Sequence, residues 1–167
     1  MKSKILLLFM AAALICSCSK DDDNNNETDS NSIVGIWQAT ELSIDDQTAS
    51  DDAKNGRDAL NFLTAKDCYI ITFTFNEDLT VVAENSVNYL SIGVNSSGTG
   101  LDIPCPTEKD TDNSTYTYDG ATLAILDSAG NTVTTAATIS GNTLTIDASG
   151  LDIPNFNASG ELIFRKQ

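Results

Sequence analysis

Histidine is absent from all 167 residues of the chain. Its absence excludes Ser-His-Asp and Cys-His catalysis and removes the commonest zinc ligand. No glycine-rich phosphate-binding loop is present either. Carboxylates are abundant, but the 24 acidic residues are scattered through turn-like sequence, and nothing singles out the two that a glycosidase would need. We therefore expect no enzyme and no cofactor.

Basic residues are scarce. The chain has nine Lys and Arg against 24 Asp and Glu, which gives a formal net charge of −15. Binding to nucleic acid depends on Lys and Arg contacts to phosphate, so we do not expect it. Acidic clusters lie at 45–46, 51–52 and 110–113. They lack the ligand spacing of an EF-hand loop, so we assign no metal site, and weak calcium binding stays open.

Long apolar runs are missing as well. The run at residues 5–15 has eleven residues, whereas about 20 are needed to span a bilayer. It follows Lys2 and Lys4, and this layout is typical of a secretory signal peptide.

Directly after this run comes Ile15-Cys16-Ser17-Cys18, which resembles a lipobox. Such a motif has an aliphatic residue, a variable one, a small one and then the cysteine that receives lipid. Ser17 is small whereas Ile15 is not, which favours Cys18 over Cys16. We expect residues 1–17 to be a signal peptide and Cys18 to carry the acyl chains, since two or more chains anchor a protein stably to a membrane. Ordinary signal cleavage that leaves Cys18 as a plain thiol is the alternative.

Residues 18–32 are expected to form a disordered tether, because 21–32 contains no aliphatic or aromatic side chain. The acidic run that begins at Asp21 resembles the export signal of Bacteroidetes-type surface lipoproteins. This resemblance implies a lipid-anchored protein on the outer face of the outer membrane. The periplasmic face is the alternative location, and a solvated charge run in a linker is the plain interpretation. Residues 33–167 then form one domain of ordinary size.

Cys68 and Cys105 are the two cysteines of that domain. An exported domain enters an oxidising compartment, so we expect a disulfide between them. The chain-entropy estimate for a loop of this length gives at most about 4 kcal/mol of stabilisation. Two buried free thiols are the alternative.

Short alternating segments separated by turn residues run through the domain and predict an all-β fold. The clearest alternation is an aromatic face formed by Tyr69, Ile71, Phe73 and Phe75. Eight or nine antiparallel strands are expected in total, at residues 33–44, 69–75, 79–84, 87–94, 114–118, 121–126, 132–139, 143–146 and 161–166.

Two segments do not fit the strand pattern. Apolar residues at helical spacing in 57–66 predict a short helix between the first two strands. Residues 95–113, rich in Gly, Ser, Pro and Asp, predict a long loop that the disulfide would pin. The pentapeptide Gly-Leu-Asp-Ile-Pro occurs at 100–104 and again at 150–154. Its flanks do not match, which argues against a duplicated domain.

Gly35-Ile36-Trp37, near the head of the first strand, resembles the Gly-x-Trp signature of lipocalins. In lipocalins an arginine from the last strand lies across the Trp ring and closes the base of the barrel. This resemblance implies that Trp37 and Arg165 form that pair. A cation over a Trp ring contributes on the order of 1 kcal/mol.

Further motifs follow in the order found in the lipocalin-like domain of many Bacteroidetes lipoproteins. They are a cysteine before an aromatic strand (Cys68), a Phe-Asn-x-Asp-Gly-Thr type hairpin (75–80), a Tyr-x-Tyr-x-Gly hairpin (116–120) and a late Leu-rich strand (144–146). Leu79 replaces the usual turn glycine, so we expect a different type of turn there. The resemblance covers residues 33–167 and implies a small antiparallel lipocalin-like (calycin-type) barrel. This family has no single agreed activity.

Two functions are open for such a barrel. Eight strands enclose an interior that side chains can fill or that can hold one small ligand. If the aromatic face lines a cavity, the protein binds a small apolar or amphipathic ligand. If the core is filled, it is a structural or protein/glycan-interaction lipoprotein that acts through loops such as 95–113. The sequence does not indicate the oligomeric state.

One turn carries a candidate modification site. Asp127-Ser128-Ala129 resembles the O-glycosylation motif of Bacteroidetes proteins, which would place a glycan on Ser128. A plain hairpin turn is the alternative.

Overall fold

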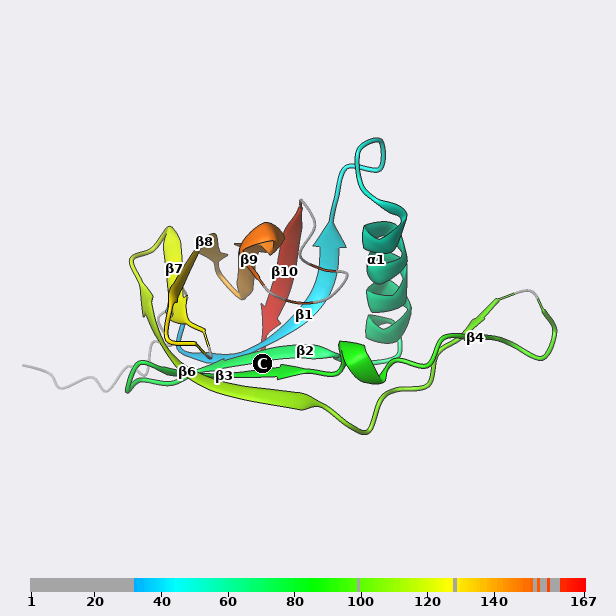
Figure 1. Ribbon diagram of the computed structural model, residues 1–167, viewed down its shortest axis with the longest axis horizontal. Coiled ribbons are helices and arrows are strands. Elements are labelled where there is room, and N and C mark those ends of the chain that lie inside the picture. The colour runs from blue at the N-terminus through cyan, green and yellow to red at the C-terminus, as the bar shows by residue number, and fades with distance from the viewer. Residues whose placement is uncertain (1–31, 99, 128, 152, 154–155, 157–159) are drawn as a thin grey trace, which may run out of the picture.

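The protein is an antiparallel β-barrel, seen in a computed structural model that describes residues 32–98, 100–127, 129–151, 153, 156 and 160–167. Within these residues eight strands close in the order β1-β10-β9-β8-β7-β6-β3-β2 (Figure 1). They are β1 (Gly35–Ser43), β2 (Ile71–Phe75), β3 (Thr80–Asn85), β6 (Asp110–Tyr118), β7 (Thr122–Leu126), β8 (Thr132–Ser140), β9 (Thr143–Asp147) and β10 (Glu161–Lys166). The predicted all-β barrel is confirmed.

Several shorter elements complete the described chain. They are the helix α1 (Asp51–Thr64), the 3-10 turns η1 (Val87–Tyr89) and η2 (Ala148–Gly150), and a ribbon of β4 (Gly93–Val94) and β5 (Leu101–Asp102). In the described part, no helix has the length and apolarity that a membrane span requires. The predicted signal peptide, Cys18 and the tether up to residue 31 lie outside the described residues.

The barrel core follows from the two-residue period of its strands. In β2, Ile71, Phe73 and Phe75 are buried, while the threonines between them are half-buried. The Phe73 ring stacks on that of Phe164 with 5.2 Å between centroids, and Phe75 meets the edge of Tyr116 at 4.8 Å. Both arrangements are favourable for aromatic pairs, so this part of the interior is packed by side chains.

Trp37 closes the base of the barrel, but its cationic partner is Lys166. The indole is fully buried, and its Nε1 donates to the Ile33 carbonyl oxygen at 2.6 Å. Lys166 Nζ lies 5.1 Å from the ring centroid and also donates to the Ser32 carbonyl oxygen at 2.9 Å. The prediction that Arg165 covers Trp37 is therefore wrong.

The alternation of β10 explains this correction. Leu162 and Phe164 are fully buried, so Lys166 is the next position on the inward face, and it pairs with Trp37 in the β1–β10 ladder. The Arg165 side chain lies on the outward face of β10. It is exposed and donates to Thr143 Oγ1. Successive side chains of a strand point to opposite faces, so a partner one residue away cannot reach the ring.

Gly35 is required by the same arrangement. Its φ of +134° lies in a region that other residues rarely adopt. A Cβ at this position would come within 2.8 Å of Lys166 Cε. The glycine of the Gly-x-Trp motif therefore leaves room for the lysine stem that reaches over Trp37.

The helix α1 begins six residues earlier than predicted, at Asp51. Ser50 caps it, because its hydroxyl accepts from the Ala53 N–H at 3.2 Å. Asp51 and Asp52 in the first turn favour the positive end of the helix dipole. Its buried Leu60 and Leu63 join the core, and α1 packs against β1 at the end of the barrel away from Trp37 (Figure 1).

The disulfide between Cys68 and Cys105 is present, with 5.9 Å between the Cα atoms. By contrast, the strand predicted at 87–94 is wrong. Asn85 Oδ1 accepts from the Val87 N–H at 2.9 Å and turns the chain into η1, after which β4 pairs with β5 in a ribbon that projects from the barrel (Figure 1). The predicted loop 95–113 likewise ends early, since β6 begins at Asp110 by pairing with β3.

Leu79 adopts a left-handed backbone conformation, which glycine adopts more readily than other residues. Its φ is +65°, and the Leu79 N–H donates to the Asn76 carbonyl oxygen at 3.2 Å. Asp78 Oδ1 accepts from the Thr80 hydroxyl at 2.6 Å, and this bond lowers the pKa of the Asp78 carboxyl. The flanking hydrogen bonds hold the Leu79 backbone in the left-handed region despite its side chain.

We predict that Leu79→Gly stabilises the protein. Left-handed backbone costs a non-glycine residue roughly 1–2 kcal/mol, and the Leu79 side chain is 54% exposed, so little packing is lost. The free energy of unfolding, measured by urea denaturation, should rise by about 1 kcal/mol. Leu79→Ala is the matched control: it keeps a Cβ and should give no gain. A loss of stability in the glycine variant would show that Leu79 packing outweighs the backbone strain.

We also predict that Lys166→Ala and Arg165→Ala differ. Removing the Lys166 ammonium should lower the free energy of unfolding by about 1 kcal/mol, since it removes the cation over Trp37. The exposed Arg165 should cost no more than about 0.5 kcal/mol. Urea unfolding can be followed by the fluorescence of Trp37, the single tryptophan of the chain. A larger loss of unfolding free energy in the arginine variant would show that Arg165, and not Lys166, is the cation over the Trp37 ring.

Candidate functional site

A pocket opens through the side of the barrel where β6 changes its neighbour. From Asp110 to Thr115 the strand pairs with β3, and from Tyr116 to Tyr118 it pairs with β7. Beyond the Tyr116–Ile125 pair, β6 and β7 diverge without a ladder between them. A cavity of about 250 Å³ lies in this gap, and we call it the lateral pocket.

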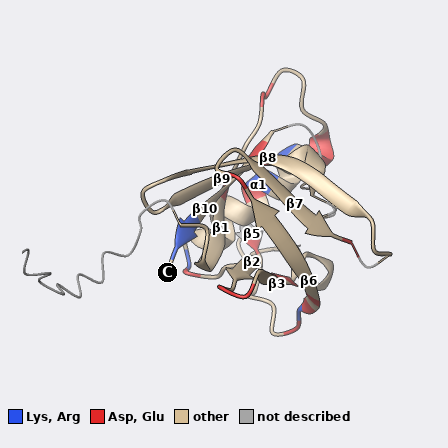
Figure 2. Ribbon diagram, turned by 90° about the vertical axis from the view of Figure 1, so that its left-hand side faces the viewer, with Lys and Arg blue, Asp and Glu red and all other residues tan. Residues whose placement is uncertain are grey.

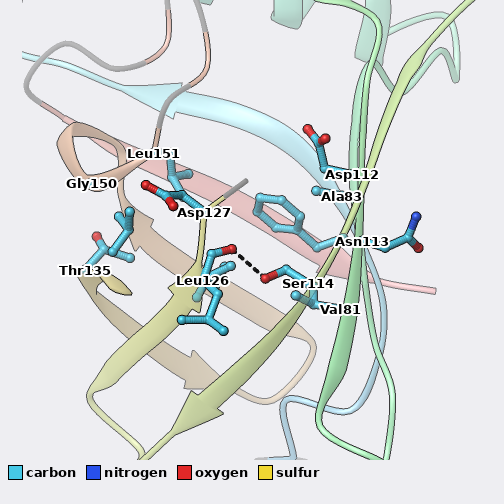
Figure 3. A pocket seen from close by; sticks show the side chains of 13 residues that line it. Val81, Ala83, Asp112, Asn113, Ser114, Leu126, Asp127, Thr135, Gly150 and Leu151 are labelled. Carbon is cyan, nitrogen blue, oxygen red and sulfur yellow. Dashed lines mark hydrogen bonds between the residues drawn. The ribbon is translucent and has the colours of Figure 1, made fainter. Parts of the chain in front are cut away.

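The hairpin of β7 and β8 also separates from the barrel on its other side. β8 pairs with β7 from Thr132 to Ala136 and with β9 from Ala137 onward. Two side-chain bonds bridge the open stretches. The Ser114 hydroxyl donates to the Leu126 carbonyl oxygen (Figure 3), and the Thr135 hydroxyl donates to the Asp147 carbonyl oxygen at 2.9 Å. The outer end of the hairpin is therefore held by single bonds in place of a continuous ladder.

Gly150 lets the chain after β9 close over this region. A Cβ on Gly150 would lie 2.4 Å from Thr135 Cβ, so only glycine permits η2 to approach β8 this closely. Leu151 follows directly and is buried, and it forms part of the pocket wall (Figure 3).

The lateral pocket is lined by both apolar and polar residues. Its apolar residues come from four strands and the segment after η2: Phe73, Val81, Ala83, Ile125, Leu126, Val133 and Leu151. Its polar residues, together with Gly150, are Asp112, Asn113, Ser114, Asp127 and Thr135. In Figure 3 the Asn113 side chain points away from the cavity, so its backbone makes the wall there. An apolar lining with a few polar groups is the usual composition of a small-molecule site.

The ladder register places two of the polar side chains on the inward face. Trp37 pairs with Phe73, Phe73 with Ala83, and Ala83 with Asp112. Directly opposed residues of antiparallel strands point to the same face, so Asp112 faces the barrel interior. Ser114 does so as well, since it pairs with the buried Val81.

Asp127 lines the same cavity from the β7 side (Figure 3). Its carboxylate accepts from the Asn131 side chain at 3.0 Å, from the Asn131 N–H at 2.7 Å and from the Ala129 N–H at 2.9 Å. These bonds, the Asn131 side chain foremost, lower the pKa of Asp127. The group is therefore charged at neutral pH while it shapes the hairpin turn.

The predicted aromatic face is only partly a cavity lining. Phe73 lines the lateral pocket, whereas Ile71 and Phe75 are buried in the packed core. Tyr69 is half-buried and precedes β2, next to the disulfide. The sequence patterns did not predict the pocket residues of β6, β7 and β8. An available signal was the face Asp112-Ser114-Tyr116-Tyr118, where polar residues occupy strand positions that a closed core would fill with apolar ones.

The described residues give no structural support for a metal site or for the predicted glycosylation site. Among the described residues, no three His, Cys, Asp or Glu side chains are grouped as a metal site would require. Ser128 lies outside the described residues.

A family model agrees with the architecture, and a solved structure is similar to the chain. No curated protein sequence matches the chain at a significant level. Among solved structures, a lipocalin-like protein from Bacteroides uniformis is similar, with 16% identity and a TM-score of 0.39 over 80% of this chain and 97% of that one. The sequence profile of the lipocalin-like domain matches residues 33–146, which is more than half of the chain. The chain therefore belongs to the lipocalin-like domain family.

Proposed function

We propose that this protein is a non-catalytic lipoprotein whose barrel binds a small apolar or amphipathic ligand in the lateral pocket. The observation that carries the proposal is an open cavity with an apolar floor, beside an aromatic cluster that is packed by side chains. A barrel filled throughout, with no mouth, would have argued against a ligand.

The size of the pocket limits the ligand. Drug-sized ligands occupy cavities of about 300–1,000 Å³. The lateral pocket has about 250 Å³, equivalent to about eight water molecules of liquid volume. This favours a compact molecule, or one end of a larger one, over a long acyl chain enclosed within the barrel.

An interaction role is the second candidate. The ribbon of β4 and β5 projects from the barrel (Figure 1). Val94 of β4 is 67% exposed, and Ile92 just before this strand is 59% exposed. The disulfide at Cys105 ties the chain after this ribbon to the start of β2. Exposed apolar side chains on a pinned projection are typical of a protein-contact surface. An empty lateral pocket in the native protein would favour this candidate.

We predict that Ala83→Leu removes the bound ligand. Ala83 is half-buried on the pocket floor, so a larger side chain would occupy the cavity. The measurement is native mass spectrometry of protein isolated gently from its own membrane, with the anchor removed by proteolysis. The unaltered protein should carry a reproducible extra mass that denaturation releases, and the variant should not.

Ala121→Leu is the control for this experiment, because it adds the same side chain at an exposed turn position between β6 and β7. It should keep the ligand. Equal occupancy in all three proteins would place the ligand elsewhere, and an absence of ligand after exposure to lipid and metabolite extracts would reject the carrier function.

The proposed anchor is the acylated Cys18, with the protein on the outer face of the outer membrane. Its support is the lipobox-like sequence and the acidic run after it. The described chain starts at the barrel base, where Ser32 contacts Lys166. A tether attached there would hold the base, and not the end with α1, nearest to the membrane.

We predict that Cys18→Ala abolishes lipidation and releases the protein from the membrane fraction, whereas Cys16→Ala leaves both unchanged. Mass spectrometry of the N-terminal peptide detects the acyl chains, and protease treatment of intact cells distinguishes surface from periplasmic display. Retention of the Cys18 variant in washed membranes would contradict the anchor.

A further inference from the structure

We infer that the lateral pocket takes a small apolar molecule that carries a positively charged amine, held between Asp112 and Asp127. The inference rests on the ligand-binding function proposed above and adds the chemical class of the ligand.

The first support is the charge of the lining. Its two ionisable residues are both acidic, and none of the lining residues is Lys or Arg. The sequence extends this asymmetry, because residues 110–164 contain no basic residue at all. These residues include β6, β7, β8 and β9, which form one continuous half of the barrel wall.

The basic residues of the described chain lie elsewhere. Figure 2 shows them on β10, beside α1 and at the start of β6. Lys109 forms a salt bridge with Glu84, and Arg57 forms salt bridges with Asp46 and Asp58. Lys166 is engaged at the barrel base. These contacts therefore hold the basic side chains away from the lateral pocket, and none of the described Lys or Arg residues lines it.

The second support is the position of Asp112. Strand register places its side chain on the inward face, in one row with Phe73 and Ala83. The side chain is exposed at the mouth of the pocket, because β6 has no ladder with β7 at this position. Among the described residues the Asp112 carboxylate has no hydrogen bond or salt bridge, so an ammonium group that enters the pocket can pair with it directly.

The third support is that the two acidic residues line one cavity from different strands (Figure 3). Asp112 belongs to β6 and Asp127 to the end of β7, and the apolar floor of Phe73, Val81 and Ala83 lies in the same cavity. An alkyl or aromatic group would contact the floor while an ammonium group lies near the carboxylates. An anionic ligand of the same shape would be repelled by both.

A series of three probes with the same alkyl chain tests this inference: hexylammonium, 1-hexanol and hexanoate. Each is titrated into the full chain while NMR follows the methyl signals of Val81, Ile125 and Val133. Hexylammonium should bind about tenfold more tightly than hexanol, because each partly exposed ion pair contributes up to about fivefold. Hexanoate should bind most weakly, and added salt should reduce the preference for the cation.

Asp112→Asn is the decisive variant, because it keeps the shape of a side chain that has no contact to lose. It should bring hexylammonium close to the affinity of hexanol. Glu41→Gln removes one charge from an exposed outward position of β1 and serves as the control. It should leave the preference unchanged, and Asp127→Asn provides a second, independent reduction.

The possible results separate the two proposals. Equal binding of hexanol and hexylammonium, with shifts at the pocket methyl groups, would overturn the amine assignment and leave ligand binding intact. An equal loss of preference in Glu41→Gln and Asp112→Asn would also overturn it, since the effect would then come from net charge alone. No shift at the pocket with any probe would count against the ligand-binding function itself.

Discussion

Closure of the sheet into a ring is the constraint on which the rest of this structure depends. Once β1 pairs with both β2 and β10, every strand must turn alternate side chains toward one shared interior. That interior is filled at the base by Trp37 and, above it, by the aromatic group of Phe73, Phe75 and Phe164. Burial of these side chains supplies the main favourable term for folding. Ile33, Gly35 and Lys166 are arranged around the indole ring of Trp37.

The same closure determines where the barrel can open. The β2–β3 and β9–β10 ladders are unbroken, whereas β6 and β8 each divide their length between two neighbours. The outer end of the β7–β8 hairpin is then left with the Ser114 and Thr135 side-chain bonds as its ties to the wall. A strand that loses its ladder loses its side-chain partners as well. The pocket, its polar rim and the mouth between β6 and β7 are consequences of that divided pairing.

Particular residues show how far sequence patterns predict such a fold. The alternation at 69–75 and the hairpin around Asp119-Gly120 predicted strands correctly, because both patterns are local. The pairing of Cys68 with Cys105 followed from the number of cysteines and the expected oxidising compartment. The helix start was missed because the Ser50 cap precedes the apolar residues that reveal the helix. Residues 87–94 were assigned to a strand because their composition suits one, yet the Asn85 side chain turns the backbone there. Arg165 was assigned to the wrong face of its strand. Counting in steps of two from Leu162 and Phe164 would have avoided this error.

The sequence by itself determined which segments and residue types form the barrel. It specified short amphipathic strands, one buried tryptophan behind a glycine, a pair of cysteines, and the absence of any cation from residue 110 to residue 164. These properties are local or compositional, so no partner strand is needed to recognise them. The tertiary structure decided which cation covers Trp37, which side of the barrel opens, and that Asp112 and Asp127 border one cavity. Each of these depends on register between strands far apart in the chain, and a shift of one residue would turn every side chain to the opposite face.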